Sequence, residues 1–143
     1  MTAKQLSVFI ENRQGRLGEV LAVLKKSGIN ILSLSLADTS EYGLLRLIVN
    51  NPEKGKSVLS ENGFSTMLTD VFVVKIGHKA GSLSDLVKIL SEKAVGVEYM
   101  YGLSVAGNNA YIVIKLSDAI TGDSVFAENG IATLSDNDIS GMV

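Results

Sequence analysis

An internal repeat is the feature of this sequence that most restricts its fold. When the second half is shifted by 66 residues onto the first, residues 12–17 (NRQGRL) align with residues 78–83 (HKAGSL). With one extra residue allowed, Glu-Asn-Gly at 61–63 falls on Glu-Asn-Gly at 128–130. Self-similarity at a fixed spacing indicates one structural unit that is present twice. We therefore predict two domains, residues 1–69 and 70–143.

Each half begins with the same order of apolar periodicities. In the first half, apolar residues alternate along residues 6–10, as they do in a half-buried strand. Residues 72–76 show the same alternation in the second half. Helical spacing follows over 17–24 and stops at Gly28, a typical residue for a helix C-terminus. The pattern predicts a strand, a glycine-containing turn and a helix in each copy.

The rest of each half contains two strands, a short helix and a final strand. In the first half these elements are predicted at 29–37, at 44–49, after Pro52, and at 64–68. The resulting order, β-α-β-β-α-β, is a split βαβ unit of ferredoxin-like type. Two short helices can cover only one face of a four-stranded antiparallel sheet. We expect an α+β protein with helices on one face of each sheet. Because only Thr69 and Asp70 separate the copies, we expect the units to pack as one rigid body.

Composition and charge exclude several function classes. The net charge is −2, which gives no electrostatic basis for binding nucleic acid or an anionic membrane non-specifically. The chain has no cysteine and one histidine, His78, so thiol catalysis is excluded and a protein-only metal cage is unfavourable. We expect no cofactor. The sequence shows neither a secretory signal nor an uninterrupted apolar run of about 18 residues, and we expect a cytoplasmic protein without a membrane partner.

The turn after the first strand, taken with the predicted topology, resembles the ACT domain family. Its Asn-x-x-Gly-x-Leu pattern over 12–17 and the Gly-Ile-Asn-Ile segment over 28–31 are similar to the family's turn and to the opening of its second strand. The resemblance covers essentially the whole chain as two tandem domains. It implies a stand-alone regulatory protein that binds an amino acid or a related small metabolite and has no catalytic activity of its own.

The resemblance implies that ligand is held at this turn, close to where two ACT domains meet. The residues that it points to are Asn12, Gln14, Gly15, Arg16 and Leu17 in the first copy and His78, Gly81, Ser82 and Leu83 in the second. Glycine lets the backbone approach a ligand, and the helix that follows offers free N–H groups to a carboxylate. We add Glu98, which could meet an α-ammonium group across the interface.

The second copy departs from the family pattern more than the first. The family's proline is Gln14 in the first copy and Ala80 in the second, and His78 replaces the turn's asparagine. The Gly-Ile-Asn segment becomes Ala-Val-Gly over 94–96. We therefore expect the two copies to bind differently, with the second altered or inactive.

Each candidate residue also has a purely structural interpretation. Asn12 can act as a turn residue, and both turn glycines would be needed without any ligand. His78 can be a surface histidine, and Arg16 can belong to a solvated helix face together with Arg13. The pair Ser117-Asp118 is expected to cap the last helix, and Asp136, Asp138 and their neighbours to lie in a polar tail.

Three other function classes compete with that of a metabolite sensor. No pair of a base and a nucleophile recurs in both copies, which argues against an enzyme. The central strands lack exposed aromatics flanked by basic residues, which argues against RNA binding. A structural or protein-interaction module with a vestigial ligand site stays open. We expect a homodimer, because an exposed sheet edge favours association, and a regulated target protein is a further expected partner.

Overall fold

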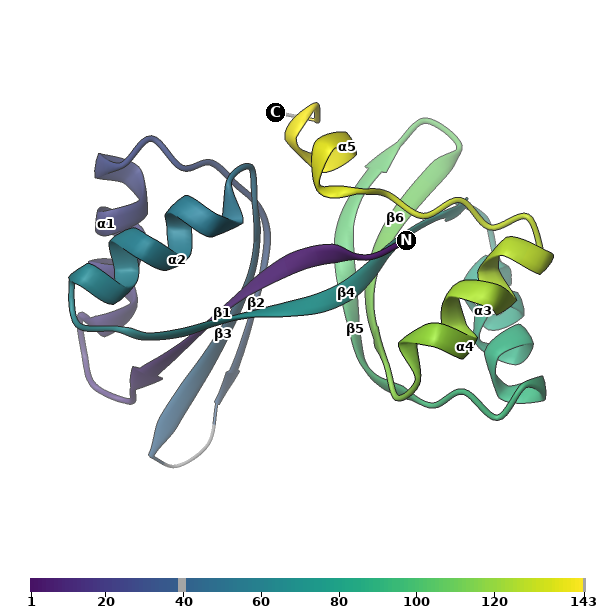
Figure 1. The fold of residues 1–143 in the computed structure, drawn as a ribbon, viewed down its shortest axis with the longest axis horizontal. Coiled ribbons are helices and arrows are strands. Elements are labelled where there is room, and N and C mark those ends of the chain that lie inside the picture. The colour runs from purple at the N-terminus through teal and green to yellow at the C-terminus, as the bar shows by residue number, and fades with distance from the viewer. Residues whose placement is uncertain (39–40, 143) are drawn as a thin grey trace. The chain divides into compact units, whose positions relative to one another are not determined.

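The computed structural model describes residues 1–38 and 41–142 (Figure 1). Eleven helices and strands are present in the described residues, in the order β1 (Ala3–Glu11), α1 (Arg16–Lys26), β2 (Ile31–Asp38), β3 (Tyr42–Val49), α2 (Pro52–Glu61), β4 (Ser65–Gly77), α3 (Ser82–Glu92), β5 (Val97–Ala106), β6 (Asn109–Leu116), α4 (Ala119–Glu128) and α5 (Asp136–Ser140). The predicted β-α-β-β-α-β order is confirmed for the first repeat, and the α+β class is confirmed for the chain.

Two compact units make up the chain. The first unit consists of Lys4–Thr69 and the segment that begins at Asp136, and the second unit consists of Met1–Ala3 and Asp70–Ser135. The expected division, 1–69 and 70–143, assigned each chain end to its own half. The division between Thr69 and Asp70 is present in the structure, whereas the two chain ends are exchanged. The expectation of one rigid body stays a prediction.

Hydrogen bonds explain the exchange of the chain ends. The amino group of Met1 forms an ion pair with Asp123 in the second unit. At the other end, the Asp136 carboxylate accepts a hydrogen bond from the Lys4 backbone N–H at 2.8 Å, and Ser140 donates to the Asn50 carbonyl at 2.8 Å. The polar tail that the sequence predicts therefore contains the short helix α5, which is anchored by the buried Ile139.

The strand order is β2-β3-β1-β4 in the first unit, which holds the first part of β4, and β4-β6-β5 in the second unit. In the first unit β3 pairs antiparallel with both β1 and β2, and in the second unit β6 pairs antiparallel with both β4 and β5. The sequence predicts two strands separated by Thr69 and Asp70. Instead, β4 runs without interruption from Ser65 to Gly77, because no glycine or proline breaks the extended chain before Gly77.

The final strand of the second repeat is reduced to a single bridge. Val74 and Thr133 form an isolated antiparallel bridge, supported by hydrogen bonds from Lys75 N to Ala132 O (3.0 Å) and from Leu134 N to Val73 O (2.8 Å). The repeat therefore predicts the position of this segment but overestimates its length.

Each unit has its own hydrophobic core between the sheet and its two long helices. The core of the first unit contains Leu6, Val8, Ile10, Val20, Leu24, Ile29, Leu45, Leu47, Val49, Leu59 and Phe64. The core of the second unit contains Phe72, Val74, Leu86, Leu90, Val95, Ile114, Leu116, Val125 and Phe126. The helices of each unit cover one face of its strands, as predicted, because each helix has only one apolar side.

A glycine in the middle of α2 and of α4 brings each helix close to the sheet. A Cβ atom added at Gly55 would lie 3.0 Å from Leu6, and one at Gly122 would lie 2.4 Å from Leu116. Both glycines are buried. Glycine is otherwise unfavourable inside a helix, so close packing is the physical reason for it here.

Candidate functional site

The turn between β1 and α1 is built by backbone geometry that requires glycine. Gly15 has φ 88° and ψ −13°, in the left-handed region, and it forms the N-cap of α1. The Asn12 N–H donates to the Glu41 carbonyl at 3.2 Å, which ties the turn to the start of β3. Because glycine has no side chain, α1 has no side-chain cap, and the Arg16 N–H in its first turn donates to the Arg13 carbonyl at 3.3 Å.

The corresponding turn between β4 and α3 has nearly the same backbone. Gly81 has φ 87° and ψ −11°, and the His78 N–H donates to the Asn108 carbonyl at 2.6 Å. The repeat seen in the sequence is therefore a repeat of turn geometry as well as of element order.

The other two long helices are capped by side chains. Asn51 accepts a hydrogen bond from the Lys54 N–H at the start of α2, and Asp118 accepts one from the Thr121 N–H at the start of α4. The pKa of Asp118 is lowered mainly by the hydrogen bond from the Thr121 side chain. A cap was predicted at Ser117-Asp118, and the structure shows that Asp118 is the capping residue. Uncapped starts therefore coincide with the two glycine turns, where the resemblance implies a ligand.

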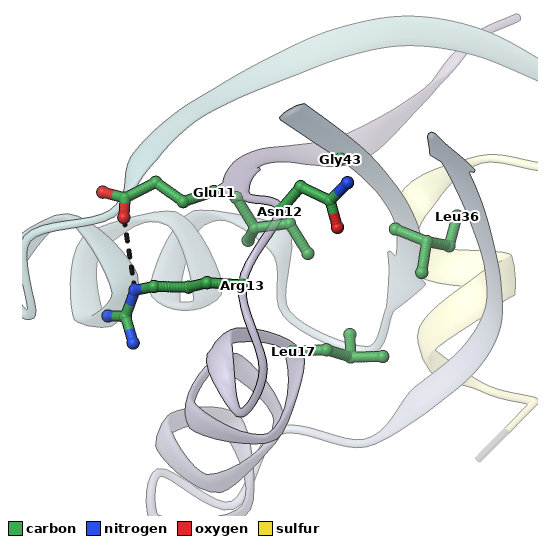
Figure 2. Close-up of a pocket in the computed structure, with 7 residues that line it drawn as sticks. Glu11, Asn12, Arg13, Leu17, Leu36 and Gly43 are labelled. Atoms are coloured by element: carbon green, nitrogen blue, oxygen red, sulfur yellow. Dashed lines mark hydrogen bonds and ion pairs between the residues drawn. The ribbon is translucent and has the colours of Figure 1, made fainter. Parts of the chain in front are cut away.

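A surface hollow of about 200 Å³ opens beside the first turn (Figure 2). Its lining consists of Ile10, Glu11, Asn12, Arg13, Leu17, Leu36 and Gly43, which come from β1, the turn, α1, β2 and β3. The lining combines apolar side chains with the Asn12 amide. Such a combination suits a small molecule with one polar end and one apolar end.

Figure 2 shows how the side chains divide around the turn. Leu17 and Leu36 extend into the same space from α1 and β2, and the Asn12 amide points toward β3. Glu11 and Arg13 turn to the other side, where Arg13 Nε donates to Glu11 at 3.2 Å. The ion pair is largely exposed, so it leaves the hollow itself without a buried charge.

Two of the five residues predicted in the first turn line this hollow. They are Asn12 and Leu17. Gln14 and Gly15 are exposed on the turn but lie outside the lining. Gly15 contributes to the site only by allowing the backbone to form the turn.

Arg16 lies outside the lining of the hollow and packs against the core residue Phe64. Its guanidinium lies 4.0 Å from the centroid of the Phe64 ring, and its side chain is only 17% exposed. Nη1 donates to Glu19 at 2.6 Å, whereas the buried Nε has no hydrogen-bond partner in the described part of the chain. The hydrogen bond from Arg16 lowers the pKa of Glu19, and the charge of Arg13 adds to this effect. Arg16 is thus neither on a solvated helix face nor in the lining of the hollow.

Five lining residues were not among the predicted site residues, and three of them, Ile10, Leu36 and Gly43, come from the strands. Antiparallel pairing places Ile10 opposite Gly43 on one side of β3, and β2 pairing places Leu36 opposite Leu45. A Cβ at Gly43 would lie 3.0 Å from the Ile10 side chain, so glycine keeps this corner open. The register of the two strand pairs would have identified these residues, but the local pattern does not encode it.

In the first unit Leu17 and Leu36 form an apolar wall of the hollow, and the second turn has no equivalent of this wall. The ladders place Gly102 where the first unit has Leu36, and Ala110 where it has Gly43. His78, Gly81 and Leu83 are all exposed. Ser82 lines a different hollow, on the other side of α3.

Glu98 lies apart from the second turn. It is exposed near the start of β5, at an irregularity in the β5–β6 pairing between Val97 and Tyr99. The lining of neither hollow described here includes it.

Residues 1–38 and 41–142 hold neither a metal-binding cluster of side chains nor a membrane-spanning helix. Within them, no group of three or more histidine, cysteine, aspartate or glutamate side chains is placed to hold a metal ion. None of the helices found there has the length and apolar character needed to cross a membrane.

Solved structures similar to this chain include a close relative and more distant ones. Protein BT0572 from Bacteroides thetaiotaomicron is 37% identical, with a TM-score of 0.93 over 98% of this chain and 96% of that chain. The regulatory subunit of aspartate kinase from Thermus thermophilus, in its ligand-free form, is 13% identical, with a TM-score of 0.62 over 87% of this chain and 91% of that one. The regulatory subunit from Thermus flavus is 15% identical, with a TM-score of 0.58 over 87% and 88%. These two distant likenesses concern the fold alone.

A search of curated proteins by sequence gave no match. The family comparison is decisive, because residues 1–143 match the family described as ACT domain pair. Topology, repeat and glycine turns all agree with that match. This chain belongs to the ACT domain pair family.

Proposed function

We propose that this protein binds an amino acid or a closely related small metabolite at the hollow of the first unit. ACT domains are typically regulatory domains that bind small molecules. The observation that carries the proposal is the coincidence of the uncapped start of α1 with the hollow lined by Asn12, Leu17 and Leu36. The second turn has the same backbone but lacks the apolar wall, so we propose one principal site of this kind.

The chemistry of the hollow suits the two ends of an apolar amino acid. The first-turn N–H groups of α1 favour a carboxylate, because they carry partial positive charge and lack a side-chain cap. The Asn12 amide can accept from an ammonium group or donate to a carboxylate. Leu17, Leu36 and Ile10 offer an apolar surface to the ligand's side chain.

Binding would act as regulation through a change in association. A ligand can shift an equilibrium only by its difference in affinity for the two states. We propose that the protein is a cytoplasmic homodimer without catalytic activity, and that ligand changes its association with itself or with a target protein. The two Thermus relatives named above are regulatory subunits, which supports a regulatory role by analogy of fold alone.

A structural or protein-interaction module is the second candidate. Its support is the size of the hollow, about 200 Å³, which is below the roughly 300–1,000 Å³ of most small-molecule pockets. The exposed, non-proline positions Gln14 and Ala80 in the two turns support it as well.

A thermal-shift screen of the twenty amino acids tests the proposal. A ligand at 100 times its dissociation constant stabilises the folded state by about 2.7 kcal/mol, which corresponds to roughly 5–10 °C in a chain of this size. We expect the largest shift from an apolar amino acid. If none of the twenty raises the melting temperature of the wild-type protein, the interaction module becomes the better interpretation.

Matched variants test where in the protein the amino acid binds. Asn12→Ala and Leu36→Gly should each reduce the shift strongly, since they remove the polar and the apolar contact in turn. Leu36→Gly copies the residue that the second unit has at this position. His78→Ala is the control, and it should leave the shift unchanged. A shift that survives Leu36→Gly but disappears in His78→Ala would move the site to the second unit.

A further inference from the structure

A second hollow, of about 240 Å³, lies in the second unit between α3, β4 and the segment after α4. Its lining consists of Lys75, Ile76, Gly77, Ser82, Asp85, Leu86, Ile89, Gly130 and Ile131. Ser82 and Asp85 stand on the first turn of α3, and a Cβ atom added at Gly77 would lie 3.5 Å from Ser82 Oγ. The hollow thus has a polar end at the start of α3 and an apolar floor formed by isoleucines.

The same place in the first unit is filled by the protein's own side chains. There the Arg16 guanidinium stacks 4.0 Å from the Phe64 centroid and donates to Glu19 at 2.6 Å. Arg16 and Glu19 are three residues apart on the first turn of α1, as Ser82 and Asp85 are on α3. The first unit therefore shows which chemical group fits this position of the fold.

The repeat alignment gives the substitutions that open the hollow. Ser82 replaces Arg16, and Ile131 replaces Phe64, so a guanidinium and an aromatic ring are both missing. Asp85 replaces Glu19, so the carboxylate that faced the guanidinium is retained. Asp85 has no ion-pair partner among the residues that the structure describes.

We propose that this hollow binds a small molecule that carries a guanidinium group on an alkyl stem. The guanidinium would donate to the Asp85 carboxylate and the Ser82 hydroxyl, in the geometry that Arg16 and Glu19 adopt in the first unit. The stem would lie against Ile76, Ile89 and Ile131, replacing water on an apolar surface. This site is separate from the amino-acid site proposed at the first turn, and neither depends on the other.

Lys75 is the opposing charge in the lining. It is exposed on β4, and its positive charge disfavours a cation and would favour an anion. The proposal therefore predicts opposite effects for the two charged residues. Neutralising Asp85 weakens binding, and neutralising Lys75 strengthens it.

An NMR titration with n-butylguanidinium chloride tests the proposal, because this probe has neither a carboxylate nor an α-ammonium group and does not report on an amino-acid site. Backbone amide signals are followed in the full chain at constant ionic strength. We expect saturable shifts at Ser82, Asp85 and Ile131, with small changes from Asn12 to Leu17. n-Butylammonium chloride should bind more weakly, because a point charge cannot form the paired hydrogen bonds of a guanidinium. Shifts that rise linearly without saturation at these three residues would overturn the proposal.

Charge variants test the sign of the ligand. Asp85→Asn should raise the dissociation constant of n-butylguanidinium by about tenfold, the effect of losing one charge-assisted hydrogen bond. Lys75→Gln should lower it by about threefold, the weaker effect of one exposed charge. The reverse order of the two variants would contradict a cation site.

A double variant fills the hollow with the side chains of the first unit. Ser82→Arg with Ile131→Phe should abolish binding of n-butylguanidinium and keep the melting temperature at or above that of the wild-type protein. A retained melting temperature shows that the loss of binding is not a loss of folding. Binding that persists in this variant would overturn the proposal. Asn12→Ala, which the amino-acid site needs, should leave the affinity for n-butylguanidinium unchanged.

Discussion

The two glycine turns share one backbone but leave space on different sides of the helix that follows. Gly15 and Gly81 agree within a few degrees, at φ 88° and 87°. In the first unit Arg16 fills the side toward Phe64, and the hollow opens toward Leu36 on β2. In the second unit the side toward Ile131 is open. Glycine and the strand ladders therefore preserve the turn, whereas two or three side chains decide where a ligand has room.

There is a physical reason why the two turns are alike while the two hollows differ. The turn needs a residue with positive φ, and few side chains tolerate it, so its geometry is restricted. A surface side chain faces no comparable restriction, and its replacement changes stability by little unless it fills space. A duplicated unit can therefore keep its fold while its two hollows acquire different chemistry.

Opening the filled side of the first unit is the most disruptive test of this comparison. Arg16→Ser with Phe64→Ile gives the first unit the side chains of the second. We expect a loss of about 2 kcal/mol in the free energy of unfolding, from the lost cation–π contact and the smaller buried side chain. Urea denaturation followed by circular dichroism measures it. An unchanged free energy would mean that the stacking of Arg16 on Phe64 does not support the first unit.

The two helix glycines give the next largest expected difference. Gly122→Ala places a Cβ 2.4 Å from Leu116, against 3.0 Å from Leu6 for Gly55→Ala. We expect Gly122→Ala to cost about 1–2 kcal/mol through overpacking, and Gly55→Ala to stay within about 1 kcal/mol of wild type because alanine favours the helix. Hydrogen exchange of amides in α2 and α4 assigns each effect to its unit. Equal costs would show that the two helices approach the sheet equally closely.

The residues after α1 and α3 predict effects of opposite sign. Gly28 has φ 71°, and its counterpart Ala94 has φ 57°, a strained value for a residue with a side chain. Gly28→Ala should cost about 1 kcal/mol, and nothing lies within 4 Å of its added Cβ, so the cost comes from the backbone alone. Ala94→Gly should gain about 0.5 kcal/mol. Melting temperatures of the two variants check both signs, and a loss for Ala94→Gly would contradict backbone strain at this site.

The smallest expected effect concerns the titration of Glu19. Its pKa lies below the ordinary value of 4.5 because Arg16 donates a hydrogen bond to the carboxylate. The resulting contribution to stability is present above about pH 4.5 and is lost as the pH falls through the lower folded-state pKa. Arg16→Met should raise the Glu19 pKa toward 4.5, and Arg13→Met should raise it less. Side-chain NMR titration measures both, and equal effects would mean that charge alone lowers this pKa.

Local sequence determined the element order and the turns of this protein. Alternating and helical spacings reflect which side of a strand or helix is buried, and they need no knowledge of distant residues. The glycine turns, the Pro52 helix start and the Asp118 cap are likewise short-range effects. The second half shows the same order of sequence patterns, so each of these inferences is supported by two copies.

Tertiary structure decided the features that depend on which distant residues meet. Leu36 joins the first hollow only through the register of β2 on β3, and Gly102 occupies its place in the second unit through the register of β5 on β6. The position of Arg16 on Phe64 joins residues 48 positions apart. The sequence pattern restricts each element by itself, and only the packing of the folded chain sets which side chains share a space.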